Sequence, residues 1–184
     1  MGVQVHGGMG FMNETLAAQL YKDARIAPIY EGTNGIQAMD LVGRKLSMGN
    51  GIAMRAMLED ISETALEARQ SNEPDFVAIA DHLDAAAAAL EETTGWMIEA
   101  MKDNRSVALG GATAYLALAG DVIGGHFLAR GALAARGDDT RPEMLALAAF
   151  FAETDLAEAP ARVPGIIGGG DVLARFGDAV LGEA

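Results

Sequence analysis

Apolar residues recur every three or four positions along most of this sequence, which is the spacing of one face of an α-helix. Three such stripes are clear, running from Met54 to Ala65, from Phe76 to Met101 and from Leu109 to Phe127. No segment alternates apolar and polar residues with the period of two that a half-buried β-strand requires. The pattern therefore predicts an all-α fold in which long amphipathic helices form a helical bundle.

Turn-forming residues predict where the later elements begin and end. Pro142 suits the first turn of a helix, so a fourth helix should start near it. Pro160, Pro164 and the glycines up to Gly170 predict a loop. Asp171 can then cap a short last helix.

A break at Gly49–Gly51 divides the sequence into two parts. Before it, we expect a helix that Asn13 caps and Pro28 ends, because a proline pushes the preceding residue toward extended geometry. We therefore place one domain at residues 1–48 and a C-terminal helical bundle at residues 52–184.

The charge balance restricts the partners of this protein. Its 184 residues include 13 Lys+Arg against 26 Asp+Glu, which gives a formal net charge of −13. Such a surface repels phosphate backbones, so we expect no nucleic-acid partner. The sequence has no cysteine, which excludes disulfides and thiolate chemistry and is compatible with the cytoplasmic location that we expect.

The stretch from Val107 to Ala135 is the most membrane-like part of the sequence. It contains Asp121, His126 and Arg130, which are costly inside a bilayer, so we interpret it as a buried helix and expect no membrane partner. The three histidines of the chain are widely separated and share no metal-ligand spacing, so we also expect no metal site.

Candidate chemistry lies in two short segments near the N-terminus. The first is the glycine-rich segment Gln4–Phe11, which can be a turn or a phosphate-binding loop, although it lacks the third glycine of a dinucleotide fingerprint. The second, Tyr30–Gln37, places Glu31 beside Gly32 and ahead of an apolar, helix-like run. Glu31 is either a solvated charge at a helix start or a general base in a dry pocket.

Three segments in this order resemble the C-terminal part of the acyl-CoA dehydrogenase family. They are QVHGGMGF at Gln4–Phe11, YKDARI at Tyr21–Ile26 and YEGTNGIQ at Tyr30–Gln37. The match covers about residues 3–46, and the remainder is similar to the extra C-terminal helical region of the subgroup that resembles 3-methylmercaptopropionyl-CoA dehydrogenase.

The resemblance implies that the chain is part of an FAD-dependent oxidoreductase of fatty acid metabolism, which converts an acyl-CoA thioester to the 2,3-enoyl-CoA. Glu31 stands at the position of the family's catalytic base, which removes the α-proton while the β-hydrogen leaves as hydride to FAD. A glutamine that is common in the family is replaced here by Gly35. The implied cofactor-binding residues are Gln4, Gly7, Gly8, Thr33 and Asn34.

The family's N-terminal helical domain, middle β-domain and first C-terminal helices have no counterpart in this sequence. We therefore expect the chain alone to retain no FAD and to be inactive. We also expect a homo-oligomer, formed through exposed apolar faces such as that of Leu16 and Leu20 or that of Leu41 and Val42. The alternative is a non-catalytic helical assembly or interaction module derived from the same family.

Overall fold

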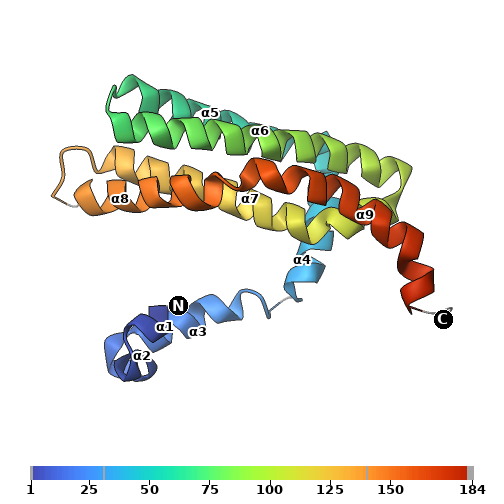
Figure 1. Ribbon diagram of the computed structural model, residues 1–184, viewed down its shortest axis with the longest axis horizontal. Coiled ribbons are helices and arrows are strands. Elements are labelled where there is room, and N and C mark those ends of the chain that lie inside the picture. Colours follow the sequence, from blue (N-terminus) through green and yellow to red (C-terminus); the bar gives the residue numbers. More distant parts are fainter. Residues whose placement is uncertain (1, 31, 140, 182–184) are drawn as a thin grey trace. The chain divides into compact units, whose positions relative to one another are not determined.

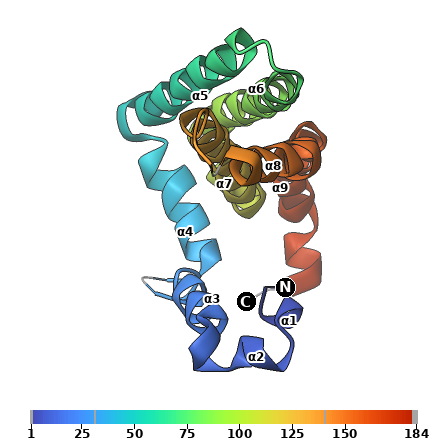
Figure 2. The same ribbon diagram turned by 90° about the vertical axis from the view of Figure 1, so that its left-hand side faces the viewer.

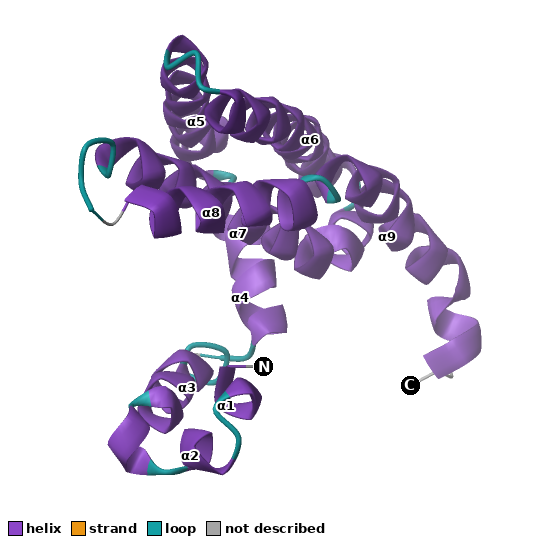
Figure 3. Ribbon diagram, turned by 60° about the vertical axis from the view of Figure 1, so that its left-hand side comes forward, coloured by secondary structure: helices purple, strands orange, loops and turns teal. Residues whose placement is uncertain are grey.

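The computed structural model describes residues 2–30, 32–139 and 141–181. Every regular element within these residues is a helix, and no strand occurs among them (Figure 3). The predicted all-α class is therefore confirmed. The backbone divides into two compact units, Met1–Gln37 and Ala38–Ala184, which we call the N-terminal unit and the bundle unit.

The N-terminal unit contains short helices (Figure 1). They are α1 (Gly2–Val5), α2 (Gly8–Phe11), the 3₁₀ turn η1 (Asn13–Thr15) and α3 (Ala17–Ile26). The glycine-rich segment thus includes one helical turn rather than a plain turn. Asn13 does not cap α3 as predicted, because it opens η1 and Leu16, with a left-handed φ of 61°, precedes α3 instead. The end of α3 shortly before Pro28 agrees with the prediction.

The bundle unit takes in the end of α4 and all later elements (Figures 1 and 2). These elements are α4 (Asn34–Asp40), the π-helical turn η2 (Leu41–Lys45), the 3₁₀ turn η3 (Met48–Gly51), α5 (Ile52–Gln70), α6 (Pro74–Asp103), α7 (Arg105–Ala134), α8 (Arg141–Phe151), the π-helical turn η4 (Ala152–Leu156) and α9 (Ala159–Leu181). The break at Gly49–Gly51 is present as consecutive left-handed residues. Our domain boundary at that break stays a prediction.

The core of the bundle unit forms where α6 packs against α5, α7 and α9. The stripe predicted on α6 is buried, with Phe76, Leu83 and Leu90 fully inaccessible to solvent. One expectation about surfaces is wrong: Val42 is buried and Leu41 packs against the core, because η2 lies on α6 and α7. Leu16, in contrast, is exposed as expected.

The predicted loop from Pro160 to Gly170 is wrong, because α9 is one helix from Ala159 to Leu181. Pro160 lies in the first turn, where its missing N–H costs nothing, and Pro164 is accommodated inside the helix. Asp171 therefore caps nothing and instead pairs with Arg175 one turn later, at 3.2 Å. Packing against α7 outweighs the weak local helix propensity of the proline and glycine residues.

Helix α7 is the most apolar long helix and would be long enough to cross a membrane by length and composition alone. Its buried stripe, which includes Tyr115, Leu118 and Val122, nevertheless belongs to the protein core. Asp121 on the same helix forms an ion pair with Arg162 of α9. These contacts match the buried bundle helix that the sequence predicts.

Candidate active site

The glycine-rich segment of the predicted cofactor site lies at the junction of α1 and α2. Gln4 is on α1, and together with His6, Leu20 and Tyr21 it lines an open hollow of about 480 Å³ within the N-terminal unit. Gly7 lies between the two helices with φ of +59°, a conformation that L-residues other than glycine rarely adopt. Its N–H donates to the carbonyl oxygen of Gln4 at 3.0 Å.

The second predicted segment lies at the start of α4. Glu31 itself is outside the described residues, whereas its neighbours Tyr30 and Gly32 are described. Gly32 has φ of +106°, so a side chain there would be strained. Thr33 precedes α4, and its carbonyl oxygen accepts a hydrogen bond from the N–H of Gln37 at 3.0 Å. Asn34 is the exposed first residue of the helix.

Gly7, Gly8 and Gln4 leave space and polar groups with which a ligand such as FAD is compatible. A Cβ built at Gly7 or Gly8 would meet no atom within 4 Å, so the chain's own packing does not explain the absence of a side chain at Gly8. An open backbone of this kind allows a planar or phosphate-bearing ligand to approach closely. The amide of Gln4 adds both hydrogen-bond donors and an acceptor at the edge of the hollow.

The predicted site residues are only partly brought together. All of them belong to the N-terminal unit. Among the residues that the structure describes there, no hydrogen bond joins Gln4, Gly7 or Gly8 to Thr33 or Asn34. Gln4 lines the hollow, whereas the other predicted cofactor-binding residues, Gly7, Gly8, Thr33 and Asn34, do not.

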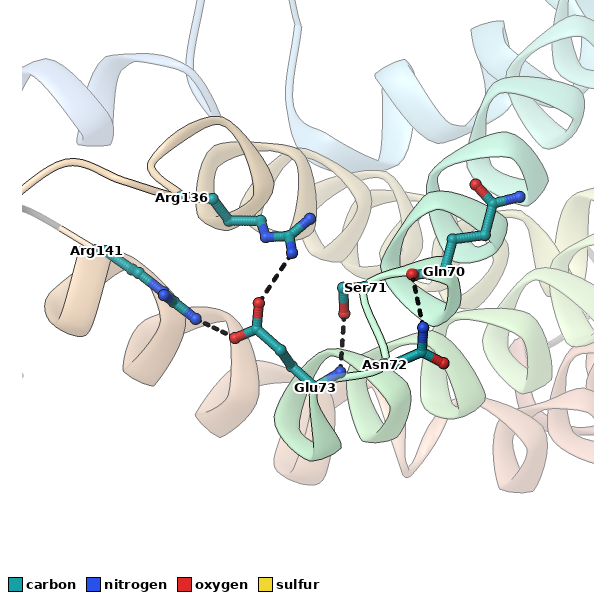
Figure 4. Close-up of polar contacts among 6 residues, drawn as sticks. All are labelled: Gln70, Ser71, Asn72, Glu73, Arg136 and Arg141. Carbon is teal, nitrogen blue, oxygen red and sulfur yellow. Dashed lines mark hydrogen bonds and ion pairs between the residues drawn. The ribbon is translucent and has the colours of Figure 1, made fainter.

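Sequence reasoning missed an ion-pair cluster in the bundle unit (Figure 4). The Glu73 carboxylate, just ahead of α6, accepts hydrogen bonds from Arg136, at 3.0 Å, and from Arg141. The Arg136 guanidinium also lies 5.7 Å from the centre of the Phe76 ring. The cluster joins the α5–α6 turn to Arg136, just after α7, and to Arg141, the first residue of α8. No periodic signal could connect residues so distant in sequence.

Two buried polar groups were also not predicted. Thr94 and Tyr115 share a hydrogen bond of 2.7 Å between α6 and α7, and burial raises the pKa of Tyr115 to about 12, although the Thr94 hydrogen bond acts in the opposite direction. His126 on α7 is buried, and its Nδ1 has no hydrogen-bond partner among the residues that the structure describes. Burial, followed by the nearby charge of Arg130, lowers the pKa of His126, which Asp60 partly offsets.

None of these polar groups forms a metal site. In the parts of the chain that the structure describes, no three His, Asp or Glu side chains are grouped so as to hold a metal ion. The buried groups lie in the bundle unit, apart in sequence from the predicted site, and we regard them as elements of its packing.

Two family models match this chain and together cover most of it. Residues 2–47 match "Acyl-CoA dehydrogenase, C-terminal domain", which includes every predicted site residue. Residues 55–176 match "Acetyl-CoA dehydrogenase C-terminal like", which covers most of the bundle unit.

Several curated proteins are similar to the chain. The 3-methylmercaptopropionyl-CoA dehydrogenase of Ruegeria pomeroyi is 38% identical over 94% of this chain and 30% of its own length. The broad-specificity linear acyl-CoA dehydrogenase FadE5 of Mycobacterium tuberculosis is 33% identical over 84% of this chain and 28% of its own length. A butyryl-CoA dehydrogenase of Syntrophomonas wolfei is 44% identical over 33% of this chain and 10% of its own length.

The chain thus spans less than a third of the length of these relatives. The first of them matches it through both the N-terminal segments and the helical bundle. From these matches, the chain belongs to the acyl-CoA dehydrogenase family and corresponds to its C-terminal helical part.

Proposed function

We propose that this chain is the C-terminal portion of an FAD-dependent acyl-CoA dehydrogenase in which Glu31 is the catalytic base. The observation that carries the proposal is the YEGT sequence at Tyr30–Thr33, inside the region that matches the family's C-terminal domain. The relatives are named for butyryl-CoA, 3-methylmercaptopropionyl-CoA and linear acyl-CoA substrates. The substrate class that we propose is therefore an acyl-CoA thioester, with its acyl group unspecified.

The proposed chemistry at Glu31 is removal of a carbon-bound proton. The thioester carbonyl acidifies the α-hydrogen, and a carboxylate with its pKa raised in a dry site can then accept it. FAD, when bound, accepts the β-hydrogen as hydride. Gly32 follows Glu31 with φ of +106°, and a Cβ there would lie 2.8 Å from Ile36 Cγ2, so both the backbone conformation and the local packing favour glycine at this position. The residues that we propose hold the cofactor are Gln4, Gly7, Gly8, Thr33 and Asn34.

The chain alone should retain no FAD and should not oxidise acyl-CoA. It spans less than a third of its relatives, so it supplies only part of the contacts that offset the entropic cost of binding. We place the intact enzyme in the cytoplasm and in fatty acid metabolism. We also propose a homo-oligomer, because exposed apolar residues such as Leu16, Leu20 and Phe150 favour association.

The decisive experiment changes Glu31 in the full-length enzyme that contains this sequence. Glu31→Gln keeps the shape of the side chain but removes the proton acceptor, so dehydrogenation should fall by on the order of 10²–10⁴ while FAD stays bound. Glu14→Gln, at an exposed position in η1, is the matched control and should leave the rate unchanged. Near-normal turnover of Glu31→Gln would refute the proposed base.

A second candidate function is a helical assembly module without chemistry. The exposed apolar side chains of the N-terminal unit favour it, since they include Phe11, Leu20 and Ile29. The two candidates differ in colour: full-length protein with bound flavin absorbs visible light, whereas a module that only assembles does not. Stoichiometric flavin in the purified 184-residue chain would contradict our expectation that the chain alone retains none.

A further inference from the structure

The 3₁₀ turn η3, which precedes α5, contains an asparagine in an uncommon backbone conformation. Gly49, Asn50 and Gly51 follow one another with φ of 59°, 54° and 81°, all in the left-handed region. Asn50 is exposed, and its side-chain amide makes no hydrogen bond to any described residue. Left-handed geometry is uncommon for residues with a side chain, although asparagine adopts it more readily than most of them.

An asparagine followed by glycine can react with its own backbone. The Gly51 nitrogen attacks the Asn50 Cγ, a C–N bond closes a five-membered succinimide ring, and the side-chain nitrogen leaves as ammonia. Water then opens the ring to aspartate or to isoaspartate, so no oxidant or cofactor is consumed. Glycine in the second position favours the attack because it has no Cβ to hinder ring closure.

A neighbouring arginine favours the first step at this asparagine. The Arg55 Nη1 donates a hydrogen bond of 2.5 Å to the Asn50 carbonyl oxygen, which belongs to the same peptide group as the attacking nitrogen. A cationic donor on that oxygen withdraws electron density, so the Gly51 N–H becomes more acidic and the nitrogen anion is easier to form.

We propose that Asn50 is a site of spontaneous deamidation. The product adds a negative charge at the corner before α5, and the isoaspartate form also adds one main-chain carbon there. Gly51 is buried, and a Cβ built on it would lie 2.7 Å from Ile98 Cδ1, so the corner has no room for added length. The modification should therefore loosen the start of α5 where it packs on α6. This inference is independent of the proposed dehydrogenase activity.

Two other asparagines serve as internal controls. Asn34 is also followed by glycine, but it begins α4, and ring closure would unwind the first turn of that helix. Asn72 shares the left-handed geometry, with φ of 57°, but it is followed by Glu73 and its amide donates to the Gln70 carbonyl oxygen at 3.2 Å. Comparison of Asn50 with Asn34 therefore shows how backbone geometry affects the deamidation rate. Comparison with Asn72 shows how the following glycine affects it.

The test follows deamidation of the folded chain by peptide mass spectrometry during incubation at mildly alkaline pH, with isoaspartate methyltransferase labelling as a second readout. Asn50 should react several-fold faster than Asn34, and Asn72 should not react measurably. In concentrated urea the rates at Asn50 and Asn34 should converge, because both are followed by glycine. A rate at Asn50 no higher than that at Asn34 in the folded chain would overturn the proposal.

A variant tests the role of the arginine. Arg55→Gln should slow the reaction at Asn50 and leave Asn34 unchanged, whereas Arg55→Lys, which retains a cationic donor, should lie between this variant and the wild type. Circular dichroism establishes that both variants are folded. If Asn50 reacts equally fast in all three proteins, the carbonyl hydrogen bond does not promote deamidation and that step of the proposal fails.

Discussion

Replacing Gly170 by alanine should destabilise the bundle unit, although alanine is the better helix former. Gly170 lies on α9 where that helix crosses α7, and a Cβ built on it would be 2.7 Å from the carbonyl carbon of Val107, with the carbonyl oxygen closer still. Both are backbone atoms and cannot rotate away. Ordinary contact begins near 3.4 Å, so clearing the carbonyl carbon alone requires a separation of about 0.7 Å, and clearing the nearer oxygen requires more.

The expected change in the free energy of unfolding follows from two opposing effects of Gly170→Ala. Forcing an additional methyl group into a packed contact costs about 1–3 kcal/mol. Exchanging glycine for alanine in a helix interior gains about 1 kcal/mol. The clash with a rigid backbone places Gly170→Ala at the upper end of the packing cost, so the free energy of unfolding should fall by on the order of 1–2 kcal/mol.

The two preceding glycines provide matched controls on the same helix. A Cβ at Gly168 or Gly169 would meet no atom within 4 Å. Each change to alanine should therefore raise the free energy of unfolding by about 0.5–1 kcal/mol. Guanidinium titrations followed by circular dichroism compare the three variants. If Gly170→Ala were as stable as Gly169→Ala, the close packing of α7 and α9 would be refuted.

Three further outcomes are expected. Tyr115→Phe should lower the free energy of unfolding by about 1 kcal/mol, because it removes a buried hydrogen bond to Thr94. Thr94→Val should then lower the stability of Tyr115→Phe less than that of the wild type, and equal losses in both proteins would contradict the pairing. Burial keeps the pKa of His126 below its ordinary value of about 6.5, so the unfolded chain takes up a proton first and stability should fall as the pH decreases below about 6.5. His126→Leu should lose that part of the acid sensitivity in denaturant titrations, and an unchanged pH profile would argue against it. Glu73→Gln should lower the free energy of unfolding by about 1 kcal/mol, whereas Glu99→Gln should lower it by about 0.3 kcal/mol. The difference arises because Glu73 joins distant segments, while Glu99 pairs within α6. Equal shifts of the thermal unfolding temperature in both variants would exclude a special role for Glu73.

The long helices could be predicted because burial and periodicity agree in them. Most residues of the predicted stripe from Phe76 to Met101 are buried, whereas Ala87, Ile98 and Met101 are only partly buried. The stretch from Pro160 to Gly170 was misjudged because proline and glycine signal a loop through local propensity alone. Its helical form depends on contact with α7, for example where a Cβ on Gly110 would lie 2.5 Å from the Cα of Gly170. A single-sequence pattern carries no information on such a contact.

The candidate site could be predicted only as a set of residues. The motifs identify Glu31, Gln4 and the glycines, and the family match includes all of them. Their arrangement did not follow from the sequence, because the hollow beside Gln4 depends on how α1 packs against α3. The ion pairs of Glu73 were not predictable either, since arginines on a distant segment carry no periodic signal.

The order of the helices has a consequence for biosynthesis. The apolar helix α7 is completed before α9, against which it packs at Gly110 and Gly111. A nascent chain therefore displays this surface on the ribosome until α9 has emerged, and transiently exposed apolar surface promotes aggregation. We expect chaperones that bind apolar helices to engage the chain in that interval. Slow translation of the α8–α9 segment should lower the yield of folded protein more than slow translation of the α5–α6 hairpin.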